Sequence, residues 1–329
     1  MKVDAHTHLF PQDYLKELEK LDTDSRHDRA WRKIMTDKVA STPSMWSVEE
    51  RLADMDGAGI DVQVLSLSIP NVYFKDTARS VYIAQMINDI YADVCRRHPE
   101  RFIAVASVPM NDSIVAIEEL RRAVGRLGMR GLVLGANVRG RPLHSEEFLP
   151  LYEEINRLKL TLFLHPMIPV GIEALEEYDM AASIGYLFDT TAAITGMVFR
   201  GIFEVNQNIK VVLPHLGAVI PFIVGRIDAS FRTRPECRQY ISSPPSEYFK
   251  RFYYDTVNYH IPALRCAIDT VGAGNLVMGS DYPFALGNMA RSVSTVRSLG
   301  LTEEEEENIC GRRILGLLSP GGLATADAQ

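Results

Sequence analysis

The sequence predicts an α/β fold, a (β/α)8 or TIM barrel with an insertion after the first strand. Eight short, almost continuously apolar segments are spread over the 329 residues, and stretches with helical periodicity separate them. Strands without polar alternation are typical of a parallel sheet that helices cover on its faces. Eight such strand and helix units are the number that closes a barrel of this class.

The eight predicted strands follow one another in a regular order. They are KVDAHTHL at 2–9, DVQVLSLS at 61–68, FIAVASVP at 102–109, GLVLGANV at 131–138, TLFLHP at 161–166, KVVLPH at 210–215, FYYDTV at 252–257 and NLVMGSDYPF at 275–284. Amphipathic stretches such as 80–98, 113–128 and 145–159 predict helices between them, because they begin with polar residues and end with basic residues or glycine. We expect one domain over residues 1–318.

Two segments fall outside this alternation. Residues 11–59 are longer and more polar than a normal connection between a strand and a helix, and we expect them to form an insertion over the barrel mouth. Their end reads SVEERLADMDGAG, in which Ser47 and Glu50 have the spacing of a helix capping box. The small and polar residues of SPGGLATADAQ, 319–329, predict a flexible tail.

Composition excludes several classes of protein. The net charge of -7 argues against a nucleic-acid partner, which normally requires a basic face. The four cysteines are far apart and form no CxxC pair, so we expect reduced thiols rather than a zinc ribbon or a disulfide framework. Because no apolar run approaches the roughly 20 residues that span a bilayer, we expect a soluble cytoplasmic protein without a membrane partner.

Polar residues stand at the ends of several predicted strands. His6 and His8 are two apart in the first strand and would share one face of it. His165 ends the fifth strand, His215 the sixth and Asp281 the eighth. In a (β/α)8 barrel the C-terminal strand ends meet at the active site, so these residues should lie together.

This group of residues indicates a metal site. Three imidazoles and a carboxylate suit a borderline divalent cation such as zinc and leave a position open for water or substrate. Taken singly, the HxH pair could be polar residues of a surface strand, His165 a core residue and Asp281 a turn residue. Their joint occurrence at four strand ends favours the metal.

An ordered set of motifs resembles the amidohydrolase superfamily, in the branch that includes 2-amino-3-carboxymuconate-6-semialdehyde decarboxylase. The resemblance covers nearly the whole chain. The motifs are DAHTHLFP at 4–11, RLADMDGAGIDVQVLS at 51–66, FLHP at 163–166, LPHLGAVIPFIVGRID at 213–228 and MGSDYPF at 278–284.

The resemblance implies one divalent metal ion, Zn2+ in the first place and Mn2+ as the alternative. Its ligands would be His6, His8, His165 and Asp281, with His215 beside the metal. Binuclear relatives carry a bridging lysine at the end of strand four, whereas GLVLGANVRGR at 131–141 has none, which favours a mononuclear site. The chain departs from the related decarboxylases where a substrate would pack, with HLGA at 215–218 in place of HGGG or HSGG and Met167 in place of a tryptophan.

The activity implied is non-oxidative decarboxylation of a small unsaturated or aromatic carboxylate. Water on a divalent metal loses its proton more readily than bulk water, and His215 is the candidate base for that proton, with Asp281 as its catalytic partner. Arg51 and Arg226 are the residues that the resemblance places on the substrate carboxylate, which arginine can hold bidentately. The resemblance also implies a homodimer in which Arg226 reaches the neighbouring site.

Two other functions stay open from the sequence. A metal-dependent hydrolase of an amide or a lactone would use the same activated water and would need no paired arginines. A metal-bound sensor or scaffold without turnover would be expected to lack the histidine that handles protons, and His215 is present. The fold alone does not separate these functions, because function depends on the site.

Overall fold

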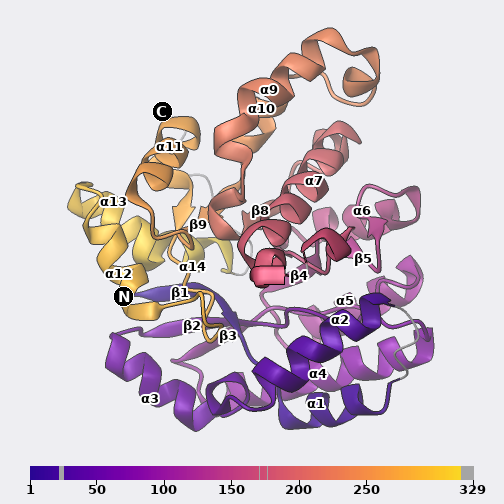
Figure 1. Cartoon of the computed structure of the whole chain (residues 1–329), viewed down its shortest axis with the longest axis vertical. Coiled ribbons are helices and arrows are strands. Elements are labelled where there is room, and N and C mark those ends of the chain that lie inside the picture. Colours follow the sequence, from indigo (N-terminus) through magenta and orange to yellow (C-terminus); the bar gives the residue numbers. More distant parts are fainter. Residues whose placement is uncertain (22–25, 170, 176, 320–329) are drawn as a thin grey trace.

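A computed structural model of the chain describes residues 1–21, 26–169, 171–175 and 177–319. Eight parallel strands lie at its centre and helices surround them (Figure 1). The strands are β1 (Val3–His8), β2 (Val62–Ser66), β3 (Phe102–Ala104), β4 (Gly131–Gly135), β7 (Thr161–His165), β8 (Lys210–Leu213), β9 (Tyr253–Asp255) and β10 (Leu276–Val277). Each lies within one of the eight predicted segments, so the predicted fold class and strand order are confirmed.

The strands follow one another around a ring. Hydrogen-bonded strands form two groups, in the orders β1-β2-β3 and β10-β9-β8-β7-β4. Backbone contacts join the two groups at both seams: Ala106 N donates to Gly131 O at 2.9 Å, and Ala5 N donates to Met278 O at 2.9 Å. All eight C-terminal strand ends therefore point to one face, as in a (β/α)8 barrel.

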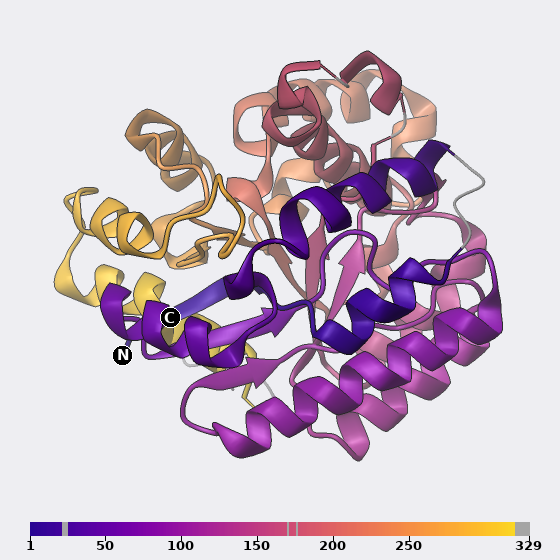
Figure 2. The same ribbon diagram turned by 60° about the horizontal axis from the view of Figure 1, so that its bottom comes forward.

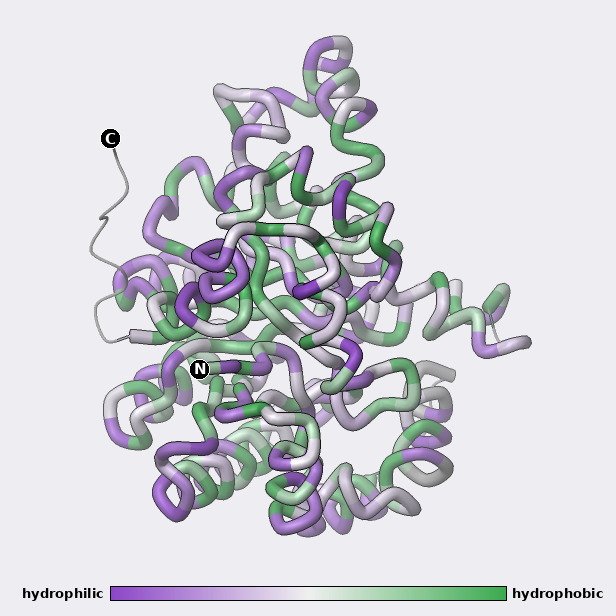
Figure 3. The backbone as a smooth tube through the Cα atoms, turned by 90° about the vertical axis from the view of Figure 1, so that its left-hand side faces the viewer, coloured by the Kyte–Doolittle hydropathy of each residue, from purple (hydrophilic) through white to green (hydrophobic). Residues whose placement is uncertain are grey.

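Mostly valine and alanine side chains, with one phenylalanine, fill the inside of the ring. They form one buried cluster of Val3, Ala5, Val62, Val64, Val105, Val133, Phe163, Val212 and Val277. Ile314, Leu317 and Leu318, in and after α14 (Arg313–Leu317), belong to the same cluster and close the N-terminal end of the barrel. A larger apolar cluster packs the helices on the outside of the strands, and green, hydrophobic stretches of the trace run through the molecule in Figure 3.

The first strand contains a β-bulge. Asp4 pairs with Gln63 and Thr7 pairs with Leu65, so Ala5 and His6 together lie opposite Val64. A bulge of this kind inserts one extra residue and re-aims the side chains that follow it. Val3 and Ala5 thus face the barrel interior before the bulge, and His6 and His8 face its C-terminal mouth after it.

Helices and short turns connect the strands. The helices are α1 (Gln12–Glu19), α2 (Arg26–Ile34), α3 (Val48–Ala58), α4 (Thr77–Arg97), α5 (Ser113–Gly125), α6 (Leu149–Arg157), α7 (Tyr186–Phe199), α8 (Ile202–Val205), α9 (Ile220–Thr233), α10 (Pro245–Phe249), α11 (Ile261–Val271), α12 (Met289–Arg297), α13 (Glu303–Glu307) and α14. The 3-10 and π turns are η1 (Met35–Val39), η2 (Pro43–Met45), η3 (Glu146–Phe148), η4 (Ile172–Leu175), η5 (Glu177–Asp179), η6 (Ala181–Gly185), η7 (His215–Gly217), η8 (Pro235–Arg238), η9 (Ala273–Asn275) and η10 (Asn308–Arg312). A small antiparallel pair, β5 (Asn137–Val138) and β6 (Arg141–Pro142), follows β4.

The segment 11–59 holds α1, α2, η1, η2 and α3. Lys38 in η1 pairs with Asp179 in η5 at 3.3 Å, and η5 follows β7, so this part of the segment lies on the face of the C-terminal strand ends (Figure 2). Ser47 caps α3 by accepting from Glu50 N at 3.2 Å, and its hydroxyl donates to Glu49. Only the serine half of the predicted capping box is thus found among the described contacts.

Two further expectations concern the ends of the chain and membranes. Of the predicted tail, 319–329, all but residue 319 lies outside the described residues. Within the described ranges, no helix combines the length and apolar character needed to cross a membrane.

Candidate metal centre

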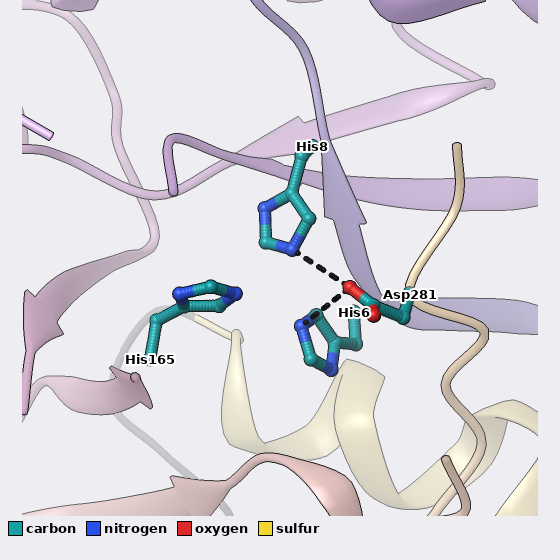
Figure 4. A group of neighbouring side chains, drawn as sticks. All are labelled: His6, His8, His165 and Asp281. Atoms are coloured by element: carbon teal, nitrogen blue, oxygen red, sulfur yellow. Dashed lines mark ion pairs between the residues drawn. The ribbon is translucent and has the colours of Figure 1, made fainter. Parts of the chain in front are cut away.

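Four buried side chains converge at the C-terminal mouth of the barrel. His6 and His8 come from β1, His165 ends β7, and Asp281 follows β10 (Figure 4). One ligand atom from each lies within 4.8 Å of the others. Asp281 Oδ1 lies 3.4 Å from His6 Nε2 and 3.2 Å from His8 Nε2. The structure therefore brings together the four residues expected to hold the metal.

The donor atoms of this group fit a cation. The Nε2 atoms of all three histidines and Asp281 Oδ1 are buried and have no hydrogen-bond partner in the described structure. The opposite ring nitrogen, Nδ1, has a partner in each case: Asp255 Oδ2 at 2.6 Å for His6, Ser66 Oγ at 3.2 Å for His8, and Pro166 O at 2.8 Å for His165. Such partners fix the ring orientation and leave the Nε2 lone pair for a metal.

The electrostatics of the group also favour a cation. Burial lowers the pKa of His8 to about 4 and holds the pKa of His165 well below its usual value. Burial acts against the charge of Asp281 too, but the imidazoles of His215 and His8, at 3.6 and 3.2 Å from its carboxylate, outweigh it and keep the pKa of Asp281 well below its usual range. For His6, the bond to Asp255 outweighs burial and raises the pKa to about 9. Neutral imidazoles at His8 and His165 and an ionised Asp281 are the forms that bind a cation, whereas at His6 a metal would compete with a proton.

His215 stands beside these four residues without joining them. It opens η7, directly after β8, and its Nε2 lies 3.6 Å from Asp281 Oδ2. Its side chain is 16% exposed, and its Nδ1 has no partner among the described residues. An imidazole at this place can exchange a proton with a group bound at the metal.

Asp255 is a site residue that sequence analysis missed. It ends β9, is 1% exposed, and bonds the ring of His6 through Oδ2. Its Oδ1 accepts from Leu216 N, next to His215, at 3.0 Å. The signal that could have found it is its place at the end of the seventh predicted strand, FYYDTV, where the other site residues also stand at strand ends.

Asp4 supports the loop that carries Asp281. It is buried on β1 and accepts from Ser280 N at 2.9 Å and from Ser280 Oγ at 2.5 Å. Burial raises the pKa of Asp4 to about 6. Asp281 itself has a φ of 61° and donates its N–H to His6 O at 2.9 Å. Asp281, which follows β10, is thus bonded directly to β1, the strand that carries His6 and His8.

The structure encloses Arg51 within the protein. Its side chain is 0% exposed, lies with its guanidinium 4.7 Å from the centre of the Tyr282 ring, and donates to Gln63 Oε1 at 2.8 Å. It also donates to the backbone carbonyl of His8. A cation enclosed in this way holds the end of β1 and the turn after Asp281, and its bonds are made within the protein. Arg51 therefore supports the site through these contacts, and its expected bond to a substrate carboxylate stays a prediction.

Arg226 lies on the surface of α9. Its guanidinium has no hydrogen bond or ion pair to the part of the chain that the structure describes. Asp228, two residues further along α9, accepts from Ser246 N at 3.0 Å. Within one chain, Arg226 is not part of the metal centre, since the group with converging ligand atoms comprises the two β1 histidines, His165 and Asp281.

The end of β4 leaves no room for a further ligand. Gly135 is its last residue, and a Cβ atom there would lie 2.6 Å from Met167 Sδ and 2.9 Å from the ring of Tyr73. A lysine at this position, as binuclear relatives have at the end of strand four, would displace both side chains. The packing therefore agrees with a mononuclear site.

A barrel with a histidine and aspartate metal centre at its C-terminal mouth defines a class, the metal-dependent (β/α)8 enzymes of amidohydrolase type. The model of a family described as amidohydrolase matches residues 3–312. The chain belongs to this family.

Its relatives include decarboxylases. The 2-amino-3-carboxymuconate-6-semialdehyde decarboxylase of Dictyostelium discoideum is 30% identical over 331 aligned positions, which cover 97% of this chain and 91% of that protein. The structure of 5-carboxyvanillate decarboxylase from Sphingomonas paucimobilis is similar with a TM-score of 0.89, at 27% identity over 96% of this chain and 98% of that one. A dihydroxybenzoic acid decarboxylase from Polaromonas, solved with manganese and 2-nitroresorcinol, has the same fold, with a TM-score of 0.81, 22% identity and 96% coverage of both chains.

Proposed function

We propose that the protein is a metal-dependent, non-oxidative decarboxylase of a small unsaturated or aromatic carboxylate, similar to 2-amino-3-carboxymuconate-6-semialdehyde. The observation that carries this proposal is the buried group of His6, His8, His165 and Asp281 with the imidazole of His215 beside it. The relatives compared above are decarboxylases, which favours carbon dioxide release over hydrolysis of an amide or a lactone.

The residues of the site divide the chemistry between them. A divalent cation held by the four ligands supplies a positive charge that polarises oxygen atoms and lowers the pKa of water. His215 holds a proton at Nε2 and, with Asp281 at 3.6 Å to orient it, delivers that proton to the substrate carbon that bears the carboxylate. The bond from this carbon to the carboxylate then breaks, carbon dioxide leaves, and the bonding electron pair restores the conjugated system. The step needs no oxidant or reductant.

We propose Zn2+ as the metal, with Mn2+ as the alternative. Three imidazole nitrogens and one carboxylate oxygen are a donor set that suits zinc. The Polaromonas relative was solved with bound manganese, which supports Mn2+ as the alternative. Elemental analysis of protein purified without added metal decides between them.

We propose further that the protein acts in the cytoplasm as a homodimer that shares Arg226 across the interface. Phe188 on α7 is 58% exposed and Phe222 on α9 is 85% exposed, as is common at protein interfaces. Arg226 lies one helical turn beyond Phe222, on a helix that projects away from the barrel in Figure 1. An arginine there could meet the substrate carboxylate in the partner's site.

A mixing experiment tests this sharing. Chains carrying His215→Asn and chains carrying Arg226→Ala are each expected to be nearly inactive. After subunit exchange, a mixed dimer with shared sites contains one site in which both residues are intact. Such a dimer should therefore have about half of the activity of an unmodified dimer. Sites built within one chain would each still lack a residue, and absence of recovery despite measured exchange would reject sharing.

The decarboxylase proposal is tested with purified protein loaded with Zn2+ or Mn2+. Unsaturated and aromatic carboxylates are screened for carbon dioxide release, and amides and lactones are screened in parallel. We expect carbon dioxide from at least one carboxylate and its loss in the His215→Asn variant. Hydrolysis of an amide or a lactone without any decarboxylation would overturn the proposal.

A further inference from the structure

One carboxylate, that of Asp255, contacts two different parts of the centre. Its Oδ2 lies 2.6 Å from His6 Nδ1. Its Oδ1 accepts from Leu216 N and from Val257 N, both at 3.0 Å. Asp255 is 1% exposed and is the last residue of β9, so its position is set by the barrel itself.

We infer that Asp255 is a positioning residue that couples the metal ligand His6 to the loop carrying His215. A carboxylate is planar and rigid, so its two oxygens fix the His6 ring and the backbone beside His215 relative to each other. This inference rests on the proposed function for its effect on turnover. Its effects on metal affinity and on the loop are independent of any substrate.

The loop needs such a support because its backbone is unusual. His215, Leu216, Gly217 and Ala218 have φ values of 53°, 59°, 71° and 59°, and three of these residues are not glycine. Backbone in this region is costly for residues with a side chain and persists only where the surroundings impose it. The bond from Leu216 N to Asp255 is one such constraint.

The neighbouring residue of β9 supplies a second constraint. A Cβ atom on Gly217 would overlap the ring of Tyr254, so the ring packs directly on the loop backbone. Tyr254 is fully buried and its hydroxyl donates to Phe249 O at 2.8 Å. The end of β9 thus holds the His215 loop through one bond and one packing contact, while the same strand end orients His6.

The test compares Asp255→Asn with a matched control, Ser66→Ala. An amide has one acceptor oxygen and a donor nitrogen, so an asparagine in place of Asp255 cannot use one oxygen for His6 and another for the loop. Ser66 orients another metal ligand, His8, at 3.2 Å, and its other side-chain bond is to Thr7 O on β1. The control therefore disturbs a metal ligand without touching the loop after β8.

Three measurements separate the possible roles. The dissociation constant for Zn2+ is measured by chelator competition, amide hydrogen exchange is followed over residues 213–219, and turnover is measured at saturating Zn2+. We expect Asp255→Asn to weaken Zn2+ binding by about 10- to 100-fold, the usual loss on removing a partner of a ligand. It should also speed exchange in the loop and lower kcat even when the metal site is full. Ser66→Ala should weaken Zn2+ binding only.

Each other outcome contradicts the coupling. Unchanged loop exchange and full recovery of kcat with added Zn2+ would make Asp255 a support of His6 alone, and unchanged Zn2+ affinity would make it a support of the loop alone. If no substrate is decarboxylated, the proposed function fails while affinity and exchange still decide this inference. Should Asp255→Asn fail to fold, Asp255→Glu, which keeps the charge and shifts it by one methylene, carries the same three measurements.

Discussion

Replacing Arg51 by alanine should lower the stability of the folded protein and should not merely weaken substrate binding. The substitution removes the buried guanidinium that donates to His8 O and to Gln63 Oε1. A hydrogen bond from a charged donor contributes about 1.5–3 kcal/mol, so these two bonds together contribute about 3–6 kcal/mol. We therefore expect the free energy of unfolding to fall by about 3–6 kcal/mol.

The loss should reach the metal as well. Arg51 holds the carbonyl of His8, and its guanidinium stacks on Tyr282, the residue after Asp281. Two of the four ligands therefore depend on it for their backbone positions. Urea unfolding of the metal-free protein gives the stability, and elemental analysis of the purified variant gives the metal content.

Arg226→Ala is the matched control, since it removes the same charge from an exposed position. It should change the free energy of unfolding by no more than about 0.5 kcal/mol and leave the metal in place. Arg226→Ala should lower the specificity constant, by about 10- to 200-fold if the guanidinium bonds a substrate carboxylate. If Arg51→Ala unfolds at the urea concentration of the unmodified protein and only raises KM, the assignment of Arg51 to the interior is wrong. Arg51→Lys, which keeps the charge and loses the second branch of the fork, serves if the alanine variant does not fold.

Three further predictions follow from the site. One equivalent of divalent metal should copurify with the chain and be lost in His165→Ala, and two tightly bound ions per chain would contradict the packing at Gly135. His215→Asn should keep the metal and slow turnover by about 10²–10⁴, since asparagine tolerates the φ of 53° at this position, and loss of metal equal to that of His165→Ala would make His215 a ligand. Asp189 bonds Met167 N at 2.8 Å, and burial raises its pKa from 3.8 to about 6. The folded state therefore binds this proton more tightly than the unfolded state, and the resulting stability is present below about pH 4 and is lost as the pH rises through about 6. As the pH rises from about 4 to about 7, the free energy of unfolding of Asp189→Asn should increase by up to about 3 kcal/mol relative to that of the unmodified protein, as measured by urea unfolding. Equal changes with pH in both proteins would refute this.

The residues predicted best from the sequence are those whose position follows from strand order alone. His165 and Asp281 end apolar segments, and the rule that C-terminal strand ends meet in a barrel places them together without knowledge of any side-chain contact. The same rule covers Asp255, yet a single aspartate at a strand end is also a common turn residue. Its function became visible only from its two oxygens, which contact residues 249 and 39 positions away in the chain.

Arg51 shows why a motif match does not fix a role. It lies in RLADMDGAG, on α3, and a sequence cannot tell whether an arginine on a helix faces solvent or the barrel wall. Buried arginine is rare unless paired, which favours the exposed interpretation. Here the carbonyl of His8 and the side chain of Gln63 supply the partners. Both come from strands outside the helix that carries Arg51, so the compensation for its burial is a tertiary feature.

The two histidines that first indicate a metal reach it through an irregularity that alternation cannot predict. In a regular strand, Val3, Ala5 and residue 7 would face the barrel interior, while His6 and His8 would turn toward the surrounding helices. The bulge places both Ala5 and His6 opposite Val64, so the interior phase shifts by one residue and His8 follows His6 toward the mouth. Thr7 then points outward, where its hydroxyl donates to Val64 O at 2.9 Å. The expectation that His6 and His8 share one face was correct, but which face they share is decided by a single extra residue in β1, and the metal centre depends on it.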